Sequence, residues 1–408
     1  MKILIHGINF WPELTGIGKY TGEMARWLTG RGHQVRVITA PPYYPQWSVL
    51  KGYSGRRWQL EVVHGARVYR CPLWVPAKLS VIKRLLHLAS FAVSSMPIML
   101  RQVLWWPDVV LVIEPPLVCA PTSMLVAQLS RSKIWLHIQD FEVDAAFDLG
   151  LLPKGKLRGA VARFERWLMN HFDRVSSISD RMINRLAEKG VSDEKGLLFP
   201  NWVDARQIFP LQSASPLRKE LGIGDDESLV LYSGNMGEKQ GLEIVIEVAR
   251  SLVHESAIRF VMCGQGAAYA RLRKLGEGLD NITWLPLQPV EKLNELLNAA
   301  DIHLLPQRAD AADLVMPSKL TGILASGRPV VATAHPGTEV WNVVRGRGIT
   351  VEPGNVEAFA GAIRELAGDA ARRASLGKAA REYAVAELDK EQVLRRFEAE
   401  LVRLVGEG

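Results

Sequence analysis

Glycine-rich turns that precede helix-like segments are the features of this sequence best suited to chemistry. In the stretch WPELTGIGKYT, Gly16 and Gly18 lie between a short apolar run and an amphipathic segment. The free N–H groups and positive dipole end of a helix N-terminus favour an anion, and glycine lets the backbone approach a phosphate closely. The spacing matches neither a dinucleotide fingerprint nor a P-loop. We expect this loop to contact a phosphate; a purely structural turn is the alternative.

Further junctions of this kind follow in the second half of the chain. Gly234 opens a loop that reaches Lys239, a cation able to neutralise a diphosphate. Lys319 lies at the start of a helix-like segment, directly after a proline and a serine that can cap the helix. Together these junctions predict a nucleotide-binding site. The residues expected to bind the nucleotide or its attached group are Gly16, Gly18, Gly234, Asn235, Lys239, Gly264, Ser318, Lys319, Gly337 and Glu339.

Acidic residues and a histidine lie at the ends of two predicted strands in the first half. A carboxylate placed there can take or share the proton of a reacting hydroxyl. Asp140 is the first acid past the strand that contains His137, and Glu142 comes next; helix capping by Asp140 is the alternative. His137 alternates with apolar residues, so a core histidine is an equal interpretation. Glu114 ends the preceding strand and either contacts a substrate or caps the chain there.

Short β-branched runs alternate with helical patterns along the whole chain. Continuous apolar strands joined by helical crossovers are typical of parallel sheets covered on both faces. The sequence therefore predicts an α/β protein with two doubly wound domains, whose ligands bind at the carboxyl ends of the strands. The predicted strands are residues 2–9, 34–40, 66–73, 108–114, 133–139 and 174–179, then 228–234, 258–264, 282–287, 302–306, 329–333 and 348–351.

A segment rich in proline and serine separates the two halves, between residues 197 and 222. We expect an N-terminal domain over residues 1–205 and a C-terminal domain over residues 206–385. Residues 386–408 are charged and amphipathic and predict a final helix with no strand after it.

The chain of 408 residues has a net charge of +7 and a pI of about 9.3. A basic balance favours nucleic acid, an anionic membrane surface or a phosphorylated substrate. No lysine- or arginine-rich block with interleaved aromatic residues occurs, so we expect no nucleic-acid partner. The three cysteines are too scattered for a disulfide framework or a zinc site, and we expect no metal. MKILIHG lacks the pattern of a signal peptide, which favours a cytoplasmic location.

Residues 78–106 combine apolar, basic and tryptophan residues. The uncharged part, residues 85–100, is shorter than the about 20 apolar residues that a spanning helix needs, and it contains Pro97. Lys83, Arg84 and Arg101 flank it. This composition suits a helix that lies in a membrane interface, so peripheral attachment to a membrane surface is expected. A kinked core helix is the alternative.

The order of these motifs resembles the family 4 glycosyltransferases of the GT-B fold, over the full length of the chain. The opening stretch up to VIT, the segment PNWVDARQIFP and the motifs CGQGAAYARL and ASGRPVVAT carry the resemblance. It implies two Rossmann-like domains that face each other across a cleft, the first binding an acceptor and the second a nucleotide sugar. No cofactor besides this co-substrate is implied. The last helix is implied to return towards the first domain.

HIQDFEVDAAFDLGLL, SGNMGEKQGLE and MPSKLTGILASG more closely resemble the WcaI-type branch, fucosyltransferases of colanic acid assembly. The branch implies transfer of a sugar, with GDP-fucose as a candidate donor, to a polyprenyl-diphosphate-linked oligosaccharide in bacterial exopolysaccharide biosynthesis. This reaction takes place at the inner face of the cytoplasmic membrane. Retention of configuration is implied by the family, and cationic side chains can replace a metal. Asp140, Glu142 and Lys239 would be catalytic, and Glu114, His137 and Asp140 would contact the acceptor.

Two departures from the family pattern concern its charged positions. The diphosphate loop of the family, G-R-x-x-x-x-K-G, has Asn235 at its arginine and Gln240 at its lysine. Its E-x7-E motif aligns with Leu314 and Gly322. We expect Lys239 and Lys319 to take over these functions. A non-catalytic nucleotide-binding subunit of the polysaccharide machinery stays open as an alternative, as does a sugar-nucleotide epimerase on the same fold.

Overall fold

The computed structural model describes residues 1–77, 80–144, 156–308 and 316–407. Leu314 and the first two residues of the 78–106 segment therefore lie outside the described residues. Contacts divide the chain into two compact units, Met1–Pro200 with Leu394–Gly408 (unit 1) and Asn201–Val393 (unit 2). The sequence prediction placed this boundary after residue 205.

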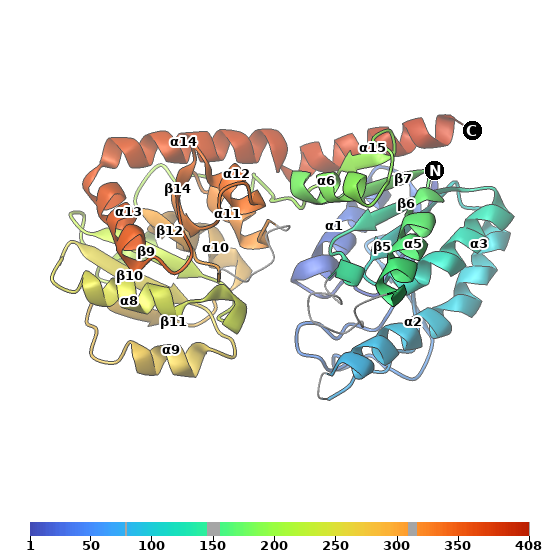
Figure 1. Ribbon diagram of the computed structural model, residues 1–408, viewed down its shortest axis with the longest axis horizontal. Helices are drawn as coiled ribbons and strands as arrows, with labels where there is room; N and C mark the ends of the chain where they lie inside the picture. Colours follow the sequence, from blue (N-terminus) through green and yellow to red (C-terminus); the bar gives the residue numbers. More distant parts are fainter. Residues whose placement is uncertain (78–79, 145–155, 309–315, 408) are drawn as a thin grey trace. The chain divides into compact units, whose positions relative to one another are not determined.

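Unit 1 contains a sheet in the order β3-β4-β2-β1-β5-β6-β7-β8 (Figure 1). Every pair in it is parallel except β3 with β4. From β1 the chain runs outward to β2, and β5 continues on the other side of β1, so the order reverses between β1 and β5. The strands are β1 (Lys2–His6), β2 (Gln34–Thr39), β3 (Gln59–Val63), β4 (Ala66–Arg70), β5 (Val109–Glu114), β6 (Lys133–Ile138), β7 (Arg174–Ser177) and β8 (Gly196–Leu198).

Helices connect these strands as crossovers. They are α1 (Gly16–Gly30), α2 (Val81–Arg101), α3 (Ala120–Ser130), α5 (Lys156–Asn170) and α6 (Asp180–Glu188), with short 3-10 turns η1 (Gln102–Trp105) and η2 (Leu117–Cys119). The six strands predicted in this half are confirmed. The strands β3 and β8 were not predicted from the sequence. The strand β3 lies at the edge of the sheet, and its residues are only half-buried or exposed. It therefore lacks the continuous apolar run by which buried parallel strands are recognised.

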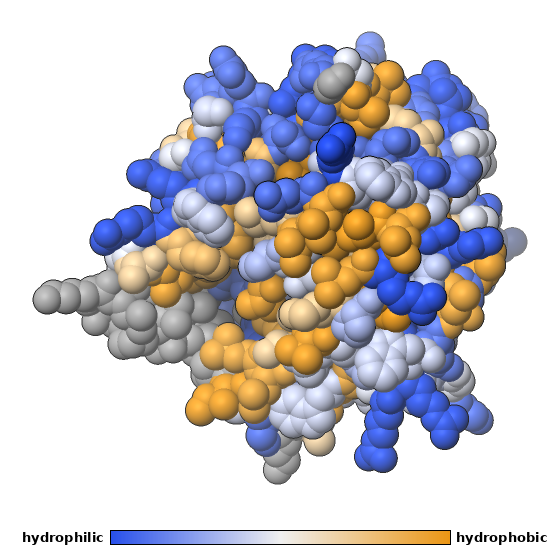
Figure 2. Space-filling view, turned by 90° about the vertical axis from the view of Figure 1, so that its right-hand side faces the viewer, coloured by the Kyte–Doolittle hydropathy of each residue, from blue (hydrophilic) through white to orange (hydrophobic). Residues whose placement is uncertain are grey.

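The long helix α2 has two apolar faces. One packs into unit 1 through Phe91 and Met99, which are fully buried. The other is exposed, and Figure 2 shows hydrophobic side chains gathered on the side of the molecule that carries α2 and α3. Residues 82–105 are long and apolar enough to cross a membrane, but α2 contacts β2 and α3 and so lies along unit 1. The exposed apolar stripe on α2 consists of Ile82, Leu86, Ala89, Val93, Met96, Leu100 and, beyond the helix, Leu104.

Unit 2 has a wholly parallel sheet in the order β11-β10-β9-β12-β13-β14. Its order reverses between β9 and β12. The strands are β9 (Ser228–Ser233), β10 (Ile258–Cys263), β11 (Ile282–Leu285), β12 (Ile302–Leu305), β13 (Val330–Thr333) and β14 (Gly348–Val351), all of which were predicted. The helices are α7 (Pro216–Glu220), α8 (Glu243–Ser251), α9 (Tyr269–Leu275), α10 (Leu293–Ala299), α11 (Ser318–Ala325), α12 (Glu339–Val344), α13 (Val356–Gly368) and α14 (Ala370–Glu387).

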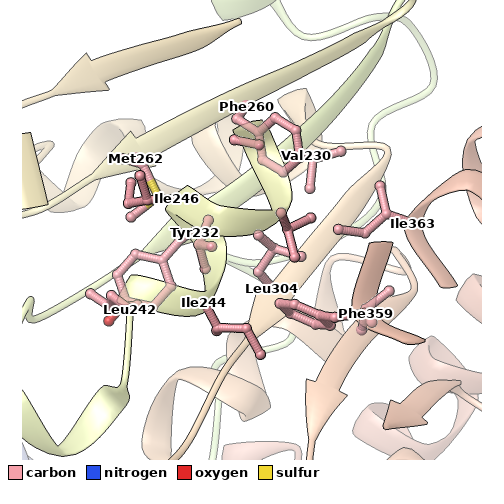
Figure 3. Close-up of a cluster of buried hydrophobic side chains, with 14 of the residues drawn as sticks. Val230, Tyr232, Leu242, Ile244, Ile246, Phe260, Met262, Leu304, Phe359 and Ile363 are labelled. Carbon is pink, nitrogen blue, oxygen red and sulfur yellow. The ribbon is translucent and has the colours of Figure 1, made fainter. Parts of the chain in front are cut away.

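A hydrophobic core joins one face of this sheet to the helices that cover it. Val230 and Phe260 of the central strands pack with Ile246 of α8 and with Phe359 and Ile363 of α13 (Figure 3). These side chains are no more than 1 % exposed. The prediction of two doubly wound α/β domains is confirmed.

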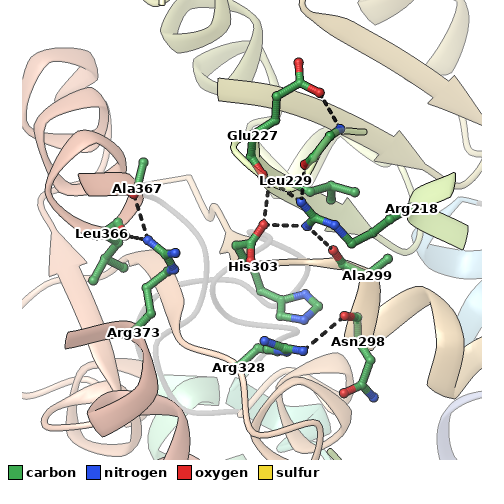
Figure 4. A network of polar contacts seen from close by, with 12 residues as sticks. Arg218, Glu227, Leu229, Asn298, Ala299, His303, Arg328, Leu366, Ala367 and Arg373 are labelled. Carbon is green, nitrogen blue, oxygen red and sulfur yellow. Dashed lines mark hydrogen bonds and ion pairs between the residues drawn. The ribbon is translucent and has the colours of Figure 1, made fainter. Parts of the chain in front are cut away.

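The amino ends of the central strands are fixed by a polar network (Figure 4). The guanidinium of Arg218 forms an ion pair with Asp301 (2.6 Å) and donates to the carbonyl oxygen of Ala299. The same Asp301 carboxylate accepts from the N–H of Leu229 at 2.8 Å. The network therefore ties the start of β9 to the start of β12 and leaves the carboxyl ends of both strands for other contacts.

The last helix, α15 (Lys390–Gly406), begins in unit 2 and ends in unit 1. In unit 2, Lys390 forms an ion pair with Asp204 at 2.5 Å. In unit 1, the ring of Phe397 stacks on Phe199 with 4.3 Å between centroids and meets the edge of Trp135 at 5.0 Å. The end of the chain thus completes an aromatic cluster of unit 1.

We predict that Phe397→Ala destabilises unit 1 by about 3 kcal/mol or more, because it leaves a cavity between Phe199 and Trp135. Urea unfolding followed by tryptophan fluorescence measures this. Val402→Ala is the matched control, since Val402 lies on the same helix and is 55 % exposed, and it should change stability by less than about 0.5 kcal/mol. Equal effects of both variants would contradict the anchoring role of Phe397.

Candidate active site

The loops after β9 and β10 meet backbone to backbone in unit 2. Gly234 has φ +137° and Gly264 has φ +146°, conformations that side chains disfavour. A Cβ on Gly264 would overlap the carbonyl oxygen of Gly234. Glycine is thus required at Gly264 by the close packing of these loops, and no ligand is needed to explain it.

Lys319 lies beside this pair of loops, at the start of α11. Its Nζ donates to the hydroxyl oxygen of Tyr232 at 3.1 Å and lies 4.4 Å from the centre of that ring. The Tyr232 hydroxyl donates in turn to the backbone carbonyl of Asn235 at 2.6 Å. A Cβ on Gly234 would lie 3.9 Å from Nζ, so the cation borders the glycine loop. Burial lowers the pKa of Lys319 to about 8.

The structure therefore brings together four of the predicted donor-side residues: Gly234, Asn235, Gly264 and Lys319. They gather where the strand order of unit 2 reverses, which is where ligands bind in open α/β sheets. Such a cation beside a glycine loop favours a phosphate or diphosphate. Tyr232 was not predicted as a site residue, since a tyrosine inside an apolar strand gives no sign that its hydroxyl will orient a lysine.

The other donor-side residues of unit 2 are Ser318, Gly337, Glu339 and Lys239. Ser318 is exposed at the first position of α11. Gly337 has φ +83° and precedes α12, where Thr338 caps the helix and Glu339 is 5 % exposed. Lys239 falls in the 3-10 turn Glu238–Gln240, and its side chain lies outside the described part of the structure.

In unit 1 the opening loop is organised around a buried carboxylate, Glu13. It accepts hydrogen bonds from the backbone N–H groups of Tyr43 and Tyr44, both at 3.0 Å, and from the side chain of Asn9 at 2.9 Å. A Cβ on Gly18 would lie 2.7 Å from the Cβ of Glu13. Gly18 is therefore needed for packing, which favours the structural alternative for this residue.

Gly16 has φ +61°, so its backbone conformation favours glycine. Its Cβ position is otherwise nearly open, with Tyr44 the nearest neighbour at 3.5 Å. A phosphate contact at this loop stays a prediction. Glu13 was not predicted as a functional residue, although an acidic residue within a glycine-rich loop was the available signal.

Two interacting carboxyl groups lie at the end of β5 and after the end of β6: Glu114, which is fully buried, and Glu142, which is half-buried. Glu114 is fully buried, and neither of its oxygens makes a hydrogen bond of normal geometry with a described residue. Burial raises its pKa well above the usual value, and the charges of Glu142 and Glu165 raise it further. Glu142 accepts from the N–H of Leu117 at 2.9 Å, and burial raises its pKa as well.

A buried lysine borders this pair. Lys189 Nζ contacts Asp144 at 2.6 Å and Glu165 at 2.7 Å. Glu165 is 2 % exposed on α5, where Leu168 and Met169 are also buried. Glu165 was not predicted from the sequence; its place on the apolar face of the amphipathic segment Lys156–Asn170 was the available signal.

The other two acceptor-side candidates differ in exposure. Asp140 is exposed just after β6. His137 is 3 % exposed and its two ring nitrogens contact Ser176 (2.9 Å) and Gln139 (2.9 Å), while burial lowers its pKa to about 3. This geometry favours the core-histidine interpretation, which the sequence left open.

Comparison with known proteins agrees with this geometry. Residues 15–202 match the model of the glycosyl transferase 4-like domain, and residues 214–383 match that of the glycosyl transferases group 1. The chain belongs to the group 1 glycosyltransferases. WcaI of Escherichia coli (strain K12), named as a colanic acid biosynthesis glycosyl transferase, is 49 % identical over 97 % of this chain and 98 % of its own length. The predicted family and its WcaI-type branch are confirmed.

Solved structures show that this glycosyltransferase has the GT-B fold. Sucrose-phosphate synthase from Thermosynechococcus elongatus aligns with a TM-score of 0.74 at 16 % identity, over 100 % of this chain and 99 % of that one. HepE of Anabaena, solved in complex with UDP, aligns with a TM-score of 0.71 at 16 % identity, over 99 % and 100 %. The predicted fold class is thus confirmed.

We predict that Glu114→Gln stabilises this glycosyltransferase at alkaline pH. A carboxyl group whose pKa is raised by folding supports the folded state while it is protonated, and this support is lost as pH rises through the raised pKa. Above that pKa the wild type keeps a buried charge that the amide does not have. Melting temperatures from pH 5 to pH 9 should therefore fall more steeply for the wild type than for Glu114→Gln.

The exposed Glu194→Gln is the matched control in unit 1 and should follow the wild type at every pH. Parallel pH profiles for Glu114→Gln and the wild type would show that Glu114 is already ionised in the folded protein.

Proposed function

We propose that this glycosyltransferase moves a sugar from a nucleotide donor, with GDP-fucose as the candidate, to a polyprenyl-diphosphate-linked oligosaccharide. The pathway would be the assembly of an exopolysaccharide like colanic acid. The observation that carries the proposal is Lys319, held by Tyr232 beside the glycine loop of unit 2. The 49 % identity with WcaI supports the pathway.

The leaving group of such a reaction is a nucleoside diphosphate, which gathers negative charge as the bond to the sugar breaks. Preorganised cations and backbone N–H groups stabilise that charge. In unit 2 these groups are Lys319 and the backbone N–H of Asn235, with Lys239 as a further cation; the N–H of Gly234 donates to the carbonyl of Cys263 instead. We propose that they neutralise the diphosphate without a metal, and that the reaction retains configuration at the sugar carbon, as the family resemblance implies.

The acceptor hydroxyl must lose its proton during transfer. We propose that unit 1 binds the acceptor at the ends of β5 and β6, with Glu142 or Asp140 taking the proton. The raised pKa of Glu142 supports it as a base with substantial proton affinity. A protonated Glu114 would donate a hydrogen bond to the acceptor. The protein would act in the cytoplasm, attached to the inner face of the membrane through residues 80–106.

The first test is thermal-shift stabilisation by GDP, UDP, ADP and their sugar conjugates. A ligand at about 100 times its Kd stabilises the folded state by about 2.7 kcal/mol. A selective rise with GDP and GDP-fucose supports the proposed donor, whereas a rise with UDP alone keeps the glycosyltransferase and contradicts the GDP donor. Binding without transfer, across all donors and with membrane acceptors, would favour a non-catalytic subunit.

We predict that Lys319→Ala weakens binding of the preferred nucleoside diphosphate about tenfold or more, because it removes a charge-assisted hydrogen bond. Isothermal titration calorimetry measures this. Lys378→Ala is the control, since Lys378 is 80 % exposed on α14 in the same unit, and it should leave the affinity unchanged. Unchanged affinity in Lys319→Ala would remove Lys319 from the donor site.

The pKa of Lys319 also predicts a pH dependence of nucleotide binding. The amine is charged below a pH of about 8 and neutral above it, so affinity for the diphosphate should fall between pH 7 and pH 9. A bound anion raises this pKa, and binding near pH 8 should therefore take up protons from the buffer. Lys319→Ala should lose this proton uptake, whereas uptake that persists in the variant would assign it to another group.

A further inference from the structure

A cavity of about 240 Å³ lies at the carboxyl-terminal end of α2, outside the sites described above. This volume exceeds that of several water molecules at about 30 Å³ each, so a phosphate group fits. The cavity is formed by the strands β2 and β4 on one side and by the end of α2 with η1 on the other. Its lining residues are Arg36, Tyr69, Ile98, Arg101, Gln102, Leu104 and Trp105.

The cavity has a concentration of positive charge. The guanidinium of Arg36 lies 4.2 Å from the centre of the Trp105 ring and donates to the side-chain oxygen of Gln102 at 2.9 Å. Arg67 lies opposite Arg36 in the parallel register of β2 and β4. Burial lowers the pKa of Arg36, and the charge of Arg67 contributes to the same shift. Arg36 and Arg101 are the two cations in the lining, whereas Arg67 and Lys2, whose Nζ donates to the backbone carbonyl of Trp105 at 3.0 Å, lie outside it.

These arginines have no acidic partner in the described part of the chain. Among the residues that the structure describes, no ion pair joins Arg36, Arg67 or Arg101 to a carboxylate. The partners of Arg36 are a neutral amide and an aromatic ring, which leave other guanidinium N–H groups available to an anion. A guanidinium preorganised in this way suits the oxygens of a phosphate.

The exposed apolar stripe on α2 leads to this cavity. Leu104, at its end, is 83 % exposed and lines the cavity, and Trp106 beyond it is 56 % exposed. Apolar residues with tryptophan and basic residues at one end are the composition of surfaces that lie at the boundary of lipid headgroups and acyl chains. A soluble phosphate would fill the cavity but leave the stripe in water. A lipid surface satisfies both.

We propose that the cavity of Arg36 and Arg101 binds the phosphate of an anionic membrane phospholipid while the stripe on α2 enters the headgroup layer. The proposal rests on the membrane attachment put forward above and adds a defined headgroup site to it. A single fixed lipid at the end of α2 would set how unit 1 is oriented on the membrane surface.

Vesicle co-sedimentation of the full chain tests this proposal. Vesicles of phosphatidylcholine alone are compared with vesicles that also contain phosphatidylglycerol. Removal of any one basic residue near an anionic surface costs about fivefold in binding. Lys83→Gln is the matched control, because Lys83 is exposed on the same helix but does not line the cavity.

We expect Arg36→Gln and Arg101→Gln each to weaken binding to phosphatidylglycerol vesicles at least tenfold, against about fivefold for Lys83→Gln. Arg101 is exposed, so its variant keeps the test valid if Arg36→Gln lowers the melting temperature. Equal losses for Arg101→Gln and Lys83→Gln would overturn the headgroup site and leave membrane attachment intact. No binding of the wild type to either kind of vesicle would overturn both the headgroup site and the membrane attachment. The proposed donor site is tested separately, by nucleotide binding.

A further arm separates the lipid from free phosphate. Inorganic phosphate is titrated into the protein without vesicles and then as a competitor with them. Weak binding and little competition at millimolar phosphate support the lipid. Tight binding of inorganic phosphate that Arg101→Gln abolishes would overturn the lipid as the occupant.

Discussion

The parallel pairing of β9 with both β10 and β12 is the constraint on which the donor side of this protein depends. It makes three strand ends meet at one edge, so the loop of each strand must share a narrow space with its neighbours. The overlap that a Cβ on Gly264 would make with the Gly234 carbonyl shows how narrow that space is. The start of α11 lies at the same edge, and from there Lys319 reaches the hydroxyl of Tyr232 at the end of β9. The arginine network at the amino ends holds the pairing in place from the other side.

Much of the fold could be predicted from local patterns, because buried parallel strands require continuous apolar runs. In β5, for example, every residue is buried, and its sequence is correspondingly a continuous apolar run that ends in Glu114. The half-exposed edge strand β3 does not. The candidate site was less predictable, since its chemistry depends on partners far apart in the chain. Lys319 was expected, but its orientation comes from Tyr232, and the neutral state expected for Glu114 comes from a burial that sequence position alone does not reveal.

Glu13 and Glu114 are both buried glutamates, but their hydrogen-bond partners differ. Glu13 is buried with three hydrogen-bond donors and organises a loop. Burial raises the pKa of both carboxyl groups, and that of Glu114, whose oxygens have no well-formed hydrogen bond to a described residue, is raised well above its usual value. An unsatisfied buried acid lowers stability, and perturbed buried groups of this kind occur at functional sites as well as in structural networks. This difference makes Glu114 the stronger candidate for substrate contact and Glu13 the stronger candidate for structure.

The path of α15 sets an order for biosynthesis. The ring of Phe397 completes the aromatic cluster of Phe199 and Trp135, yet all of unit 2 is encoded between Phe199 and Phe397. A ribosome therefore releases the whole of unit 2 before the residues that finish unit 1 leave the exit tunnel. Most of unit 1 is synthesised first, yet unit 1 is the last to become complete. Phe199 and Trp135 lack the ring of Phe397 until nearly two hundred further residues have been added.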